Sequence, residues 1–126
     1  MADSLRVLVV EDDQPIQSLL EEALAEGGFE ASIASSGEEA LTLLREGKYD
    51  LLALDIKLGQ DGIRGWHVAR RARTLNPGLP VIYITGAAAE DWAVHGVAKS
   101  IMLAKPFTPS QLINAISQLM PARCAS

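Results

Sequence analysis

The sequence predicts an α/β fold built around a parallel sheet. Short apolar runs, several of them rich in β-branched residues, recur along the chain, and stretches with helical periodicity lie between them. This alternation is typical of a parallel sheet with helices on both faces and right-handed crossovers. The expected strands are Leu5–Val10, Glu30–Ala34, Leu51–Leu54, Val81–Ile84 and Ser100–Leu103.

The first three helical segments carry recognisable start or stop signals. Pro15–Gly27 places apolar residues on one face at helical spacing, with proline suited to the first turn and glycine to the end. The next helix begins at a capping box, Ser36–Glu39, and runs to about Glu46. Gly65–Leu75 reads as a third helix, which an Asn-Pro-Gly sequence ends.

The last helix begins at a second capping box, Thr108–Gln111, and ends near Met120. The stretch Ala87–His95 has little periodicity, and we expect only a short helix there. Five strand–helix units in 126 residues are too few for a TIM barrel. We therefore predict a (βα)5 three-layer sandwich with the flavodoxin-like strand order 2-1-3-4-5.

Length and composition limit the class of protein. A chain of 126 residues is expected to be a single domain over 1–126, with its core at about 5–119 and no output domain. The net charge of −5 argues against nucleic acid as a partner. We find neither an apolar run long enough to span a membrane nor an N-terminal signal peptide. The single cysteine, Cys124, fits a reduced cytoplasmic setting.

Acidic residues follow the first expected strand directly, as Glu11-Asp12-Asp13. Carboxylates packed at one strand end repel each other unless a cation lies among them. Oxygen ligands with no neighbouring Cys or His suit Mg²⁺ or Mn²⁺. We predict a divalent metal site here, and we assign Asp13 mainly to capping the helix that begins at Pro15.

Polar side chains also follow three other strands, as Asp55, Thr85 and Lys105. Parallel strands end at one edge of the sheet, so these residues are expected to meet the acidic cluster. A carboxylate beside a metal is a suitable nucleophile toward phosphorus. The metal ion, the Lys105 ammonium and the Thr85 hydroxyl could each hold one equatorial oxygen of the transferred phosphoryl group. Asp55 would then become an aspartyl phosphate.

These residues carry a resemblance to a known family. The chain resembles the receiver domain of two-component response regulators over about Leu5 to Leu119. The segments that carry this resemblance are Val9-Val10-Glu11-Asp12-Asp13, Leu54-Asp55, Thr85-Gly86 and Lys105-Pro106-Phe107.

The resemblance implies a metal site and a phosphoryl acceptor. Glu11, Asp12 and Asp55 would bind Mg²⁺, together with the backbone carbonyl of Lys57. Asp55 would accept its phosphoryl group from a histidine kinase or a phosphotransfer protein. The phosphorylated protein would act on an unknown downstream protein, as a monomer or weak dimer.

The resemblance also assigns roles to residues near the last two strands. Lys105 would contact the phosphoryl group, Thr85 would hydrogen-bond it, and the Lys105-Pro106 bond would be cis. Many receivers carry a switch aromatic where this chain has Met102. Tyr83 is a candidate substitute, although packing under a helix is the more ordinary role for such a residue.

Two further features concern signalling output. Thr85-Gly86, followed by three alanines, is similar to a receiver subgroup whose Thr-Gly loop is mobile. Trp92 is a candidate partner contact, because tryptophan is favoured at interfaces.

Other functions remain open at this point. A phosphotransfer intermediate or phosphate sink would share the chemistry, and a pseudo-receiver would only bind partners. A flavodoxin-like cofactor binder would need a phosphate loop after the first strand, where this chain has carboxylates. An aspartate-based phosphatase would need a second Asp at the position of Lys57. We expect a phosphoacceptor rather than an enzyme.

Overall fold

The computed structural model describes residues 5–55, 65–85, 100–104 and 107–120. The strands are β1 (Arg6–Val10), β2 (Glu30–Ala34), β3 (Leu51–Asp55), β4 (Val81–Thr85) and β5 (Ser100–Ala104). The helices are α1 (Gln14–Glu26), α2 (Gly37–Glu46), α3 (Gly65–Leu75) and α5 (Pro109–Leu119). The helix predicted at Ala87–His95 lies outside the described residues.

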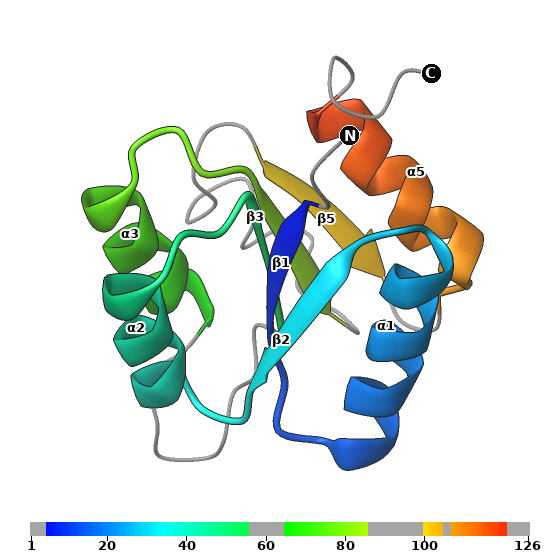
Figure 1. Ribbon diagram of the computed structural model, residues 1–126, viewed down its shortest axis with the longest axis horizontal. Helices are drawn as coiled ribbons and strands as arrows, with labels where there is room; N and C mark the ends of the chain where they lie inside the picture. The colour runs from blue at the N-terminus through cyan, green and yellow to red at the C-terminus, as the bar shows by residue number, and fades with distance from the viewer. Residues whose placement is uncertain (1–4, 56–64, 86–99, 105–106, 121–126) are drawn as a thin grey trace.

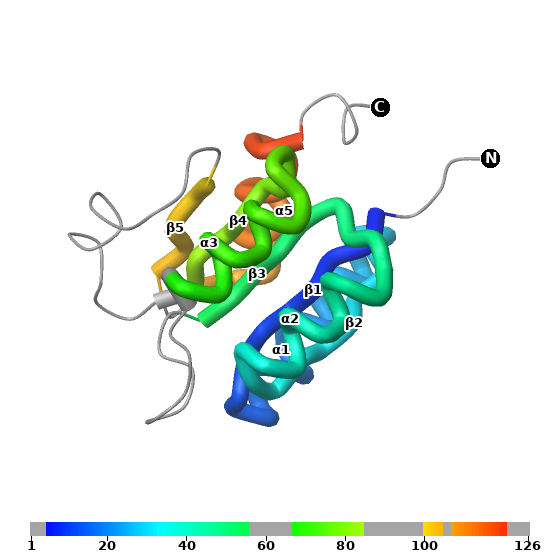
Figure 2. The backbone as a smooth tube through the Cα atoms, turned by 90° about the vertical axis from the view of Figure 1, so that its left-hand side faces the viewer, coloured from blue at the N-terminus to red at the C-terminus, as the bar shows by residue number. Residues whose placement is uncertain are grey.

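The predicted strand order is confirmed. The strands form one sheet in the order β2-β1-β3-β4-β5, and each neighbouring pair is parallel. This order can be followed across Figure 2, where α2 and α3 lie in front of the sheet. Figure 1 shows α2 and α3 on one face and α1 and α5 on the other. Each strand begins and ends within one residue of its predicted bounds.

The alternating direction of strand side chains builds two cores. Leu8 and Val10 of β1 belong to the buried cluster under α2 and α3, whereas Val7 and Val9 belong to the cluster under α1 and α5. All four side chains are buried, so β1 is apolar on both faces from Val7 to Val10. Burial of one such side chain contributes about 1.5–3 kcal/mol to folding. A strand buried on both faces explains the continuous apolar run in the sequence.

The capping box predicted for α5 is confirmed. The backbone N–H of Gln111 donates to Thr108 Oγ1 at 3.2 Å, and the backbone N–H of Thr108 donates to Gln111 Oε1 at 2.8 Å. The box predicted for α2 is only half formed. Ser36 Oγ accepts from the backbone N–H of Glu39 at 3.1 Å, but the Glu39 carboxylate accepts from the backbone N–H of Ser35, at 2.7 Å.

The capping role predicted for Asp13 is wrong as regards its side chain. Asp13 occupies the position before α1, but its carboxylate accepts no hydrogen bond from the helix. A capping side chain normally accepts from the second or third helical residue. Pro15 occupies the second position and has no N–H to donate. The Asp13 backbone N–H donates instead to Glu11 Oε2 at 3.2 Å.

The α5 capping box yields a stability prediction. Replacing Thr108 with alanine removes the side-chain acceptor at the start of α5, and we expect the free energy of unfolding to fall by about 1 kcal/mol. Urea unfolding of the wild type and the variant measures this loss. Ser110→Ala, in the first turn of the same helix, is the matched control. Equal losses in the two variants would contradict a specific capping role for Thr108.

Candidate metal centre

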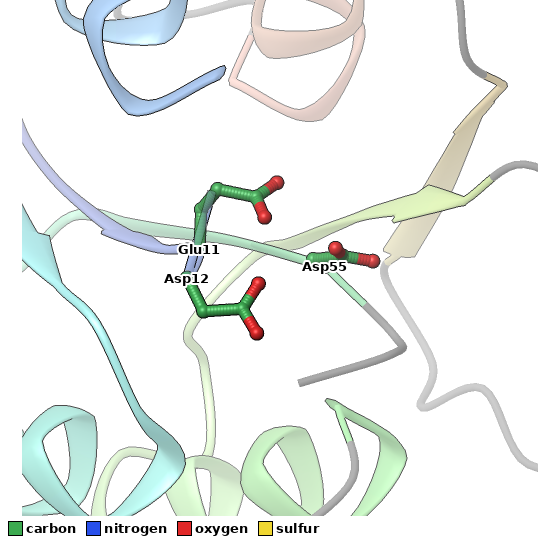
Figure 3. A group of neighbouring side chains, drawn as sticks. All are labelled: Glu11, Asp12 and Asp55. Atoms are coloured by element: carbon green, nitrogen blue, oxygen red, sulfur yellow. The ribbon is translucent and has the colours of Figure 1, made fainter. Parts of the chain in front are cut away.

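Three carboxylates meet at the carboxyl edge of the sheet. Glu11, Asp12 and Asp55 each offer an oxygen, and these oxygens lie within 4.8 Å of one another. Figure 3 shows Glu11 and Asp12 leaving the end of β1 on either side of the chain, with Asp55 beside them. Glu11 is 1% exposed and Asp55 is 7% exposed, whereas Asp12 is open to solvent. The cluster therefore has two buried members and one exposed member.

Strand pairing explains why residues far apart in sequence meet here. β1 and β3 are neighbours, and Val10 lies opposite Leu54 in their register. The next residues along the two strands are Glu11 and Asp55, so both leave the sheet at the same place. Asp55 is the last residue of β3. Its carboxylate thus lies at the end of a strand whose residues are all buried.

The donor set fits a hard divalent cation. Like charges at this separation disfavour one another, and burial increases the cost of each buried charge. A divalent cation would offset both effects. Carboxylate oxygens with several remaining positions for water or phosphate are typical of Mg²⁺ binding in proteins. Glu11, Asp12 and Asp55 can therefore hold Mg²⁺, and Mn²⁺ suits the same ligands.

Sequence reasoning missed one polar residue that donates a hydrogen bond to the backbone of the acidic cluster. Gln17, in α1, donates hydrogen bonds from Nε2 to the backbone carbonyl of Glu11 and to Ser35 Oγ. Helical side chains lean toward the N-terminus of their helix. A carboxamide one turn into a helix that follows acidic residues is therefore a signal that could have been used.

The other predicted site residues are only partly described. Thr85 ends β4, opposite Ala104 of β5, at the same edge of the sheet as Asp55. Phe107 follows the predicted Lys-Pro pair and packs against the α1–α5 core. The predicted site or output residues that lie outside the described ranges are Lys57, Gly86, Trp92, Lys105 and Pro106.

Tyr83 and Met102 lie side by side within the sheet. They are opposite each other in the β4–β5 register. Tyr83 is fully buried in the core under α2 and α3, and Met102 is half-buried against that core. Partial burial lowers the pKa of the Arg73 guanidinium in α3, and Tyr83 nearby opposes part of this shift. Tyr83 thus occupies the core position expected of a packed strand aromatic.

Comparison with known proteins assigns the family. The model of the response regulator receiver domain matches residues 7–117. The chain belongs to the response regulator receiver domain family. Receiver domains are phosphorylated by histidine kinases, and they typically act as phosphoacceptors in signalling rather than as enzymes. The acidic cluster is typical of the Mg²⁺ site in receivers.

Individual relatives agree with this assignment. The receiver domain is 30% identical over 118 residues to the transcriptional regulatory protein CusR of Escherichia coli K12, a match that covers 92% of this chain and 51% of CusR. A probable transcriptional regulatory protein, SilR of Salmonella typhimurium, matches to the same extent. The chain thus spans about half the length of these curated relatives.

Solved structures of receivers superpose closely on this one. A response regulator receiver protein from Sinorhizobium medicae WSM419 has a TM-score of 0.90 at 41% identity, covering 96% of this chain and 98% of that one. The response regulator TrrA of Thermotoga maritima, solved in complex with Mg²⁺-BeF, has a TM-score of 0.82 at 33% identity, covering 92% and 99%. Among the described residues, no helix of the receiver is long and apolar enough to cross a membrane.

Proposed function

We propose that this receiver accepts a phosphoryl group on Asp55 from a histidine kinase or a histidine phosphotransfer protein, in a Mg²⁺-dependent reaction, and signals through protein contacts. The observation that carries the proposal is the placement of Asp55. Its carboxylate is nearly buried at the end of β3, and its oxygen lies within 4.8 Å of oxygens from Glu11 and Asp12.

The proposed transfer is a substitution at phosphorus. An Asp55 carboxylate oxygen forms a bond to the phosphorus of a phosphohistidine, and the bond from phosphorus to the imidazole nitrogen breaks. The imidazole leaves as the neutral base once it has taken a proton. Later attack by water on the aspartyl phosphate restores the carboxylate and releases inorganic phosphate.

Different residues of this chain are proposed to bind the metal, position the nucleophile and contact the phosphoryl oxygens. Glu11 and Asp12 would hold Mg²⁺ beside Asp55, and the carbonyl of Lys57 is a further proposed ligand. When bound, the cation would neutralise part of the negative charge on the phosphoryl oxygens. β3 fixes Asp55 so that the nucleophile is already in place. Lys105 and Thr85 are proposed to hold the remaining oxygens, and the Lys105-Pro106 bond is proposed to be cis.

The proposed signal passes from Asp55 to the protein surface through the ends of β4 and β5. Thr85 would move toward the phosphoryl group, and Met102 and Tyr83 would adjust beside it. Met102 is unbranched and adaptable, which favours a graded repacking. Trp92 is a proposed contact for the downstream protein. We propose a cytoplasmic receiver that acts as a monomer or weak dimer.

Two alternative functions predict different phosphate flow. A phosphotransfer intermediate or phosphate sink would take the phosphoryl group and pass it to a second histidine or to water, without binding an output partner. A pseudo-receiver would bind a partner without being phosphorylated. The intact acidic cluster argues against the pseudo-receiver. It is compatible with both the proposed signalling receiver and a phosphotransfer intermediate or phosphate sink.

A small phosphodonor tests the proposal without a cognate kinase. We expect incubation with acetyl phosphate and Mg²⁺ to add one phosphoryl group, observed in the mass spectrum of the intact protein. Replacing Mg²⁺ with excess EDTA should abolish the gain. A protein that binds Mg²⁺ but gains no mass with acetyl phosphate or phosphoramidate would contradict the proposed function and favour the pseudo-receiver.

A further inference from the structure

Gln17 bridges the two loops that border the acidic cluster. It lies in the first turns of α1 and is half-buried. Its Nε2 atom donates one hydrogen bond to the backbone carbonyl of Glu11 and another to Ser35 Oγ, the latter at 3.1 Å. Glu11 follows β1 and Ser35 follows β2. One side-chain nitrogen thus joins the carboxyl ends of two neighbouring strands.

Glu11 is held by hydrogen bonds at three separate points. Its backbone N–H donates to the carbonyl of Ala34 at 3.0 Å, and its backbone carbonyl accepts from Gln17. Its side-chain Oε2 accepts from the backbone N–H of Asp13 at 3.2 Å. The bond from Gln17 is the one of these three that a side-chain substitution outside Glu11 can remove while leaving every backbone group in place.

The other end of the bridge is also fixed. The backbone N–H of Ser35 donates to the Glu39 carboxylate at 2.7 Å, which ties Ser35 to the first turn of α2. Gln17 itself is anchored in α1, where its backbone N–H donates to the carbonyl of Asp13 at 2.9 Å. The Gln17 amide therefore connects Glu11 and Ser35, each of which also forms a hydrogen bond through its own backbone N–H.

We propose that Gln17 is a positioning residue for the metal site. By donating to the Glu11 carbonyl and to Ser35, its amide holds the Glu11–Asp12 turn in the conformation that brings both carboxylates beside Asp55. The inference rests on the metal site of the proposed function. Partners behind metal ligands contribute to affinity because they orient the ligands before the ion binds.

The substitution Gln17→Met tests this role, because methionine has a similar length and donates no hydrogen bond. We expect the dissociation constant for Mg²⁺, measured by isothermal titration calorimetry on the full chain, to rise about five- to ten-fold. The rate of phosphorylation by acetyl phosphate at saturating Mg²⁺ should stay within about two-fold of wild type, because the side-chain hydrogen bonds of Gln17 go to Glu11 and Ser35 and not to the acceptor Asp55.

Two further variants sharpen the test. Gln14→Met is the matched control, since Gln14 is exposed and lies one turn earlier in the same helix; we expect its Mg²⁺ dissociation constant to equal that of wild type. Ser35→Ala leaves the bond to Glu11 in place, so we expect a rise of less than about two-fold. Should Gln17→Met fail to fold, Gln17→Asn, one methylene too short to span both acceptors, carries the same expected rise.

The outcomes separate this inference from the proposed function. If wild type binds no Mg²⁺, the metal site itself is wrong. If wild type binds Mg²⁺ and the Gln17 variant binds it as tightly as Gln14→Met does, the positioning role is overturned. If the Gln17 variant loses its maximal phosphorylation rate but keeps its Mg²⁺ affinity, Gln17 acts on the transfer and the positioning role is again overturned.

Discussion

Asp55→Asn is expected to abolish phosphorylation by acetyl phosphate, lowering the rate at least about a hundred-fold. The amide of asparagine is too weak a nucleophile to attack phosphorus, whereas the carboxylate that it replaces carries the reacting oxygen. The side chains have nearly the same shape, so the core around β3 should remain folded. Intact-mass spectrometry over time measures the rate, and circular dichroism checks the fold.

The same substitution at the opposite end of this strand provides the control. Asp50 directly precedes β3, and its carboxylate accepts a hydrogen bond from the backbone N–H of Arg6 at 2.8 Å. An asparagine oxygen can accept the same bond, so Asp50→Asn should be phosphorylated at the wild-type rate. A phosphorylated Asp55→Asn protein would contradict the assignment of the acceptor.

Asp12→Asn is expected to weaken Mg²⁺ binding by roughly a hundred-fold. The substitution removes one negative charge from the acidic cluster and replaces a strong oxygen ligand with a weaker one. Asp12 is the exposed member of the three, so its replacement by the similarly shaped asparagine changes no side chain of the core. Isothermal titration calorimetry measures the affinity. The rate of phosphorylation at a low Mg²⁺ concentration should also fall, and it should recover in part when the Mg²⁺ concentration is raised.

The adjacent acidic residue is a close control for charge alone. Asp13 is exposed, lies one residue further along, and does not belong to the cluster of three. Asp13→Asn removes the same charge near the site but no ligand, so its Mg²⁺ affinity should fall by no more than about two-fold. Equal losses in Asp12→Asn and Asp13→Asn would mean that general electrostatic attraction, rather than coordination, holds the ion.

The fold was predictable because local patterns and sheet geometry agree. The run Val7 to Val10 is buried on both faces, as a central parallel strand must be, and its continuous apolar character showed this in the sequence. All three members of the cluster, Glu11, Asp12 and Asp55, were predictable because parallel strands end at one edge of the sheet. The strand order then made them neighbours.

Hydrogen bonds across loops were harder to predict. The Asp13 side chain makes no capping hydrogen bond because Pro15 occupies the second helical position. Whether Pro15 falls at that position depends on the exact residue at which the helix begins, and sequence patterns define this residue poorly. Likewise, the Glu39 carboxylate accepts from the backbone N–H of Ser35 instead of that of Ser36. Helix-capping propensities do not distinguish between these two neighbouring donors. The contact of Gln17 with Glu11 depends on how α1 leaves β1, which is set by tertiary packing.

Locating the phosphoryl group on the chain tests the central claim most directly. Wild-type protein is phosphorylated with acetyl phosphate and Mg²⁺, and borohydride then reduces the acyl phosphate so that the modified aspartate becomes homoserine. Peptide mass spectrometry finds the converted residue. We predict conversion at Asp55 alone. Conversion at another carboxylate, or a phosphoryl group that resists reduction because it sits on a hydroxyl, would contradict the account.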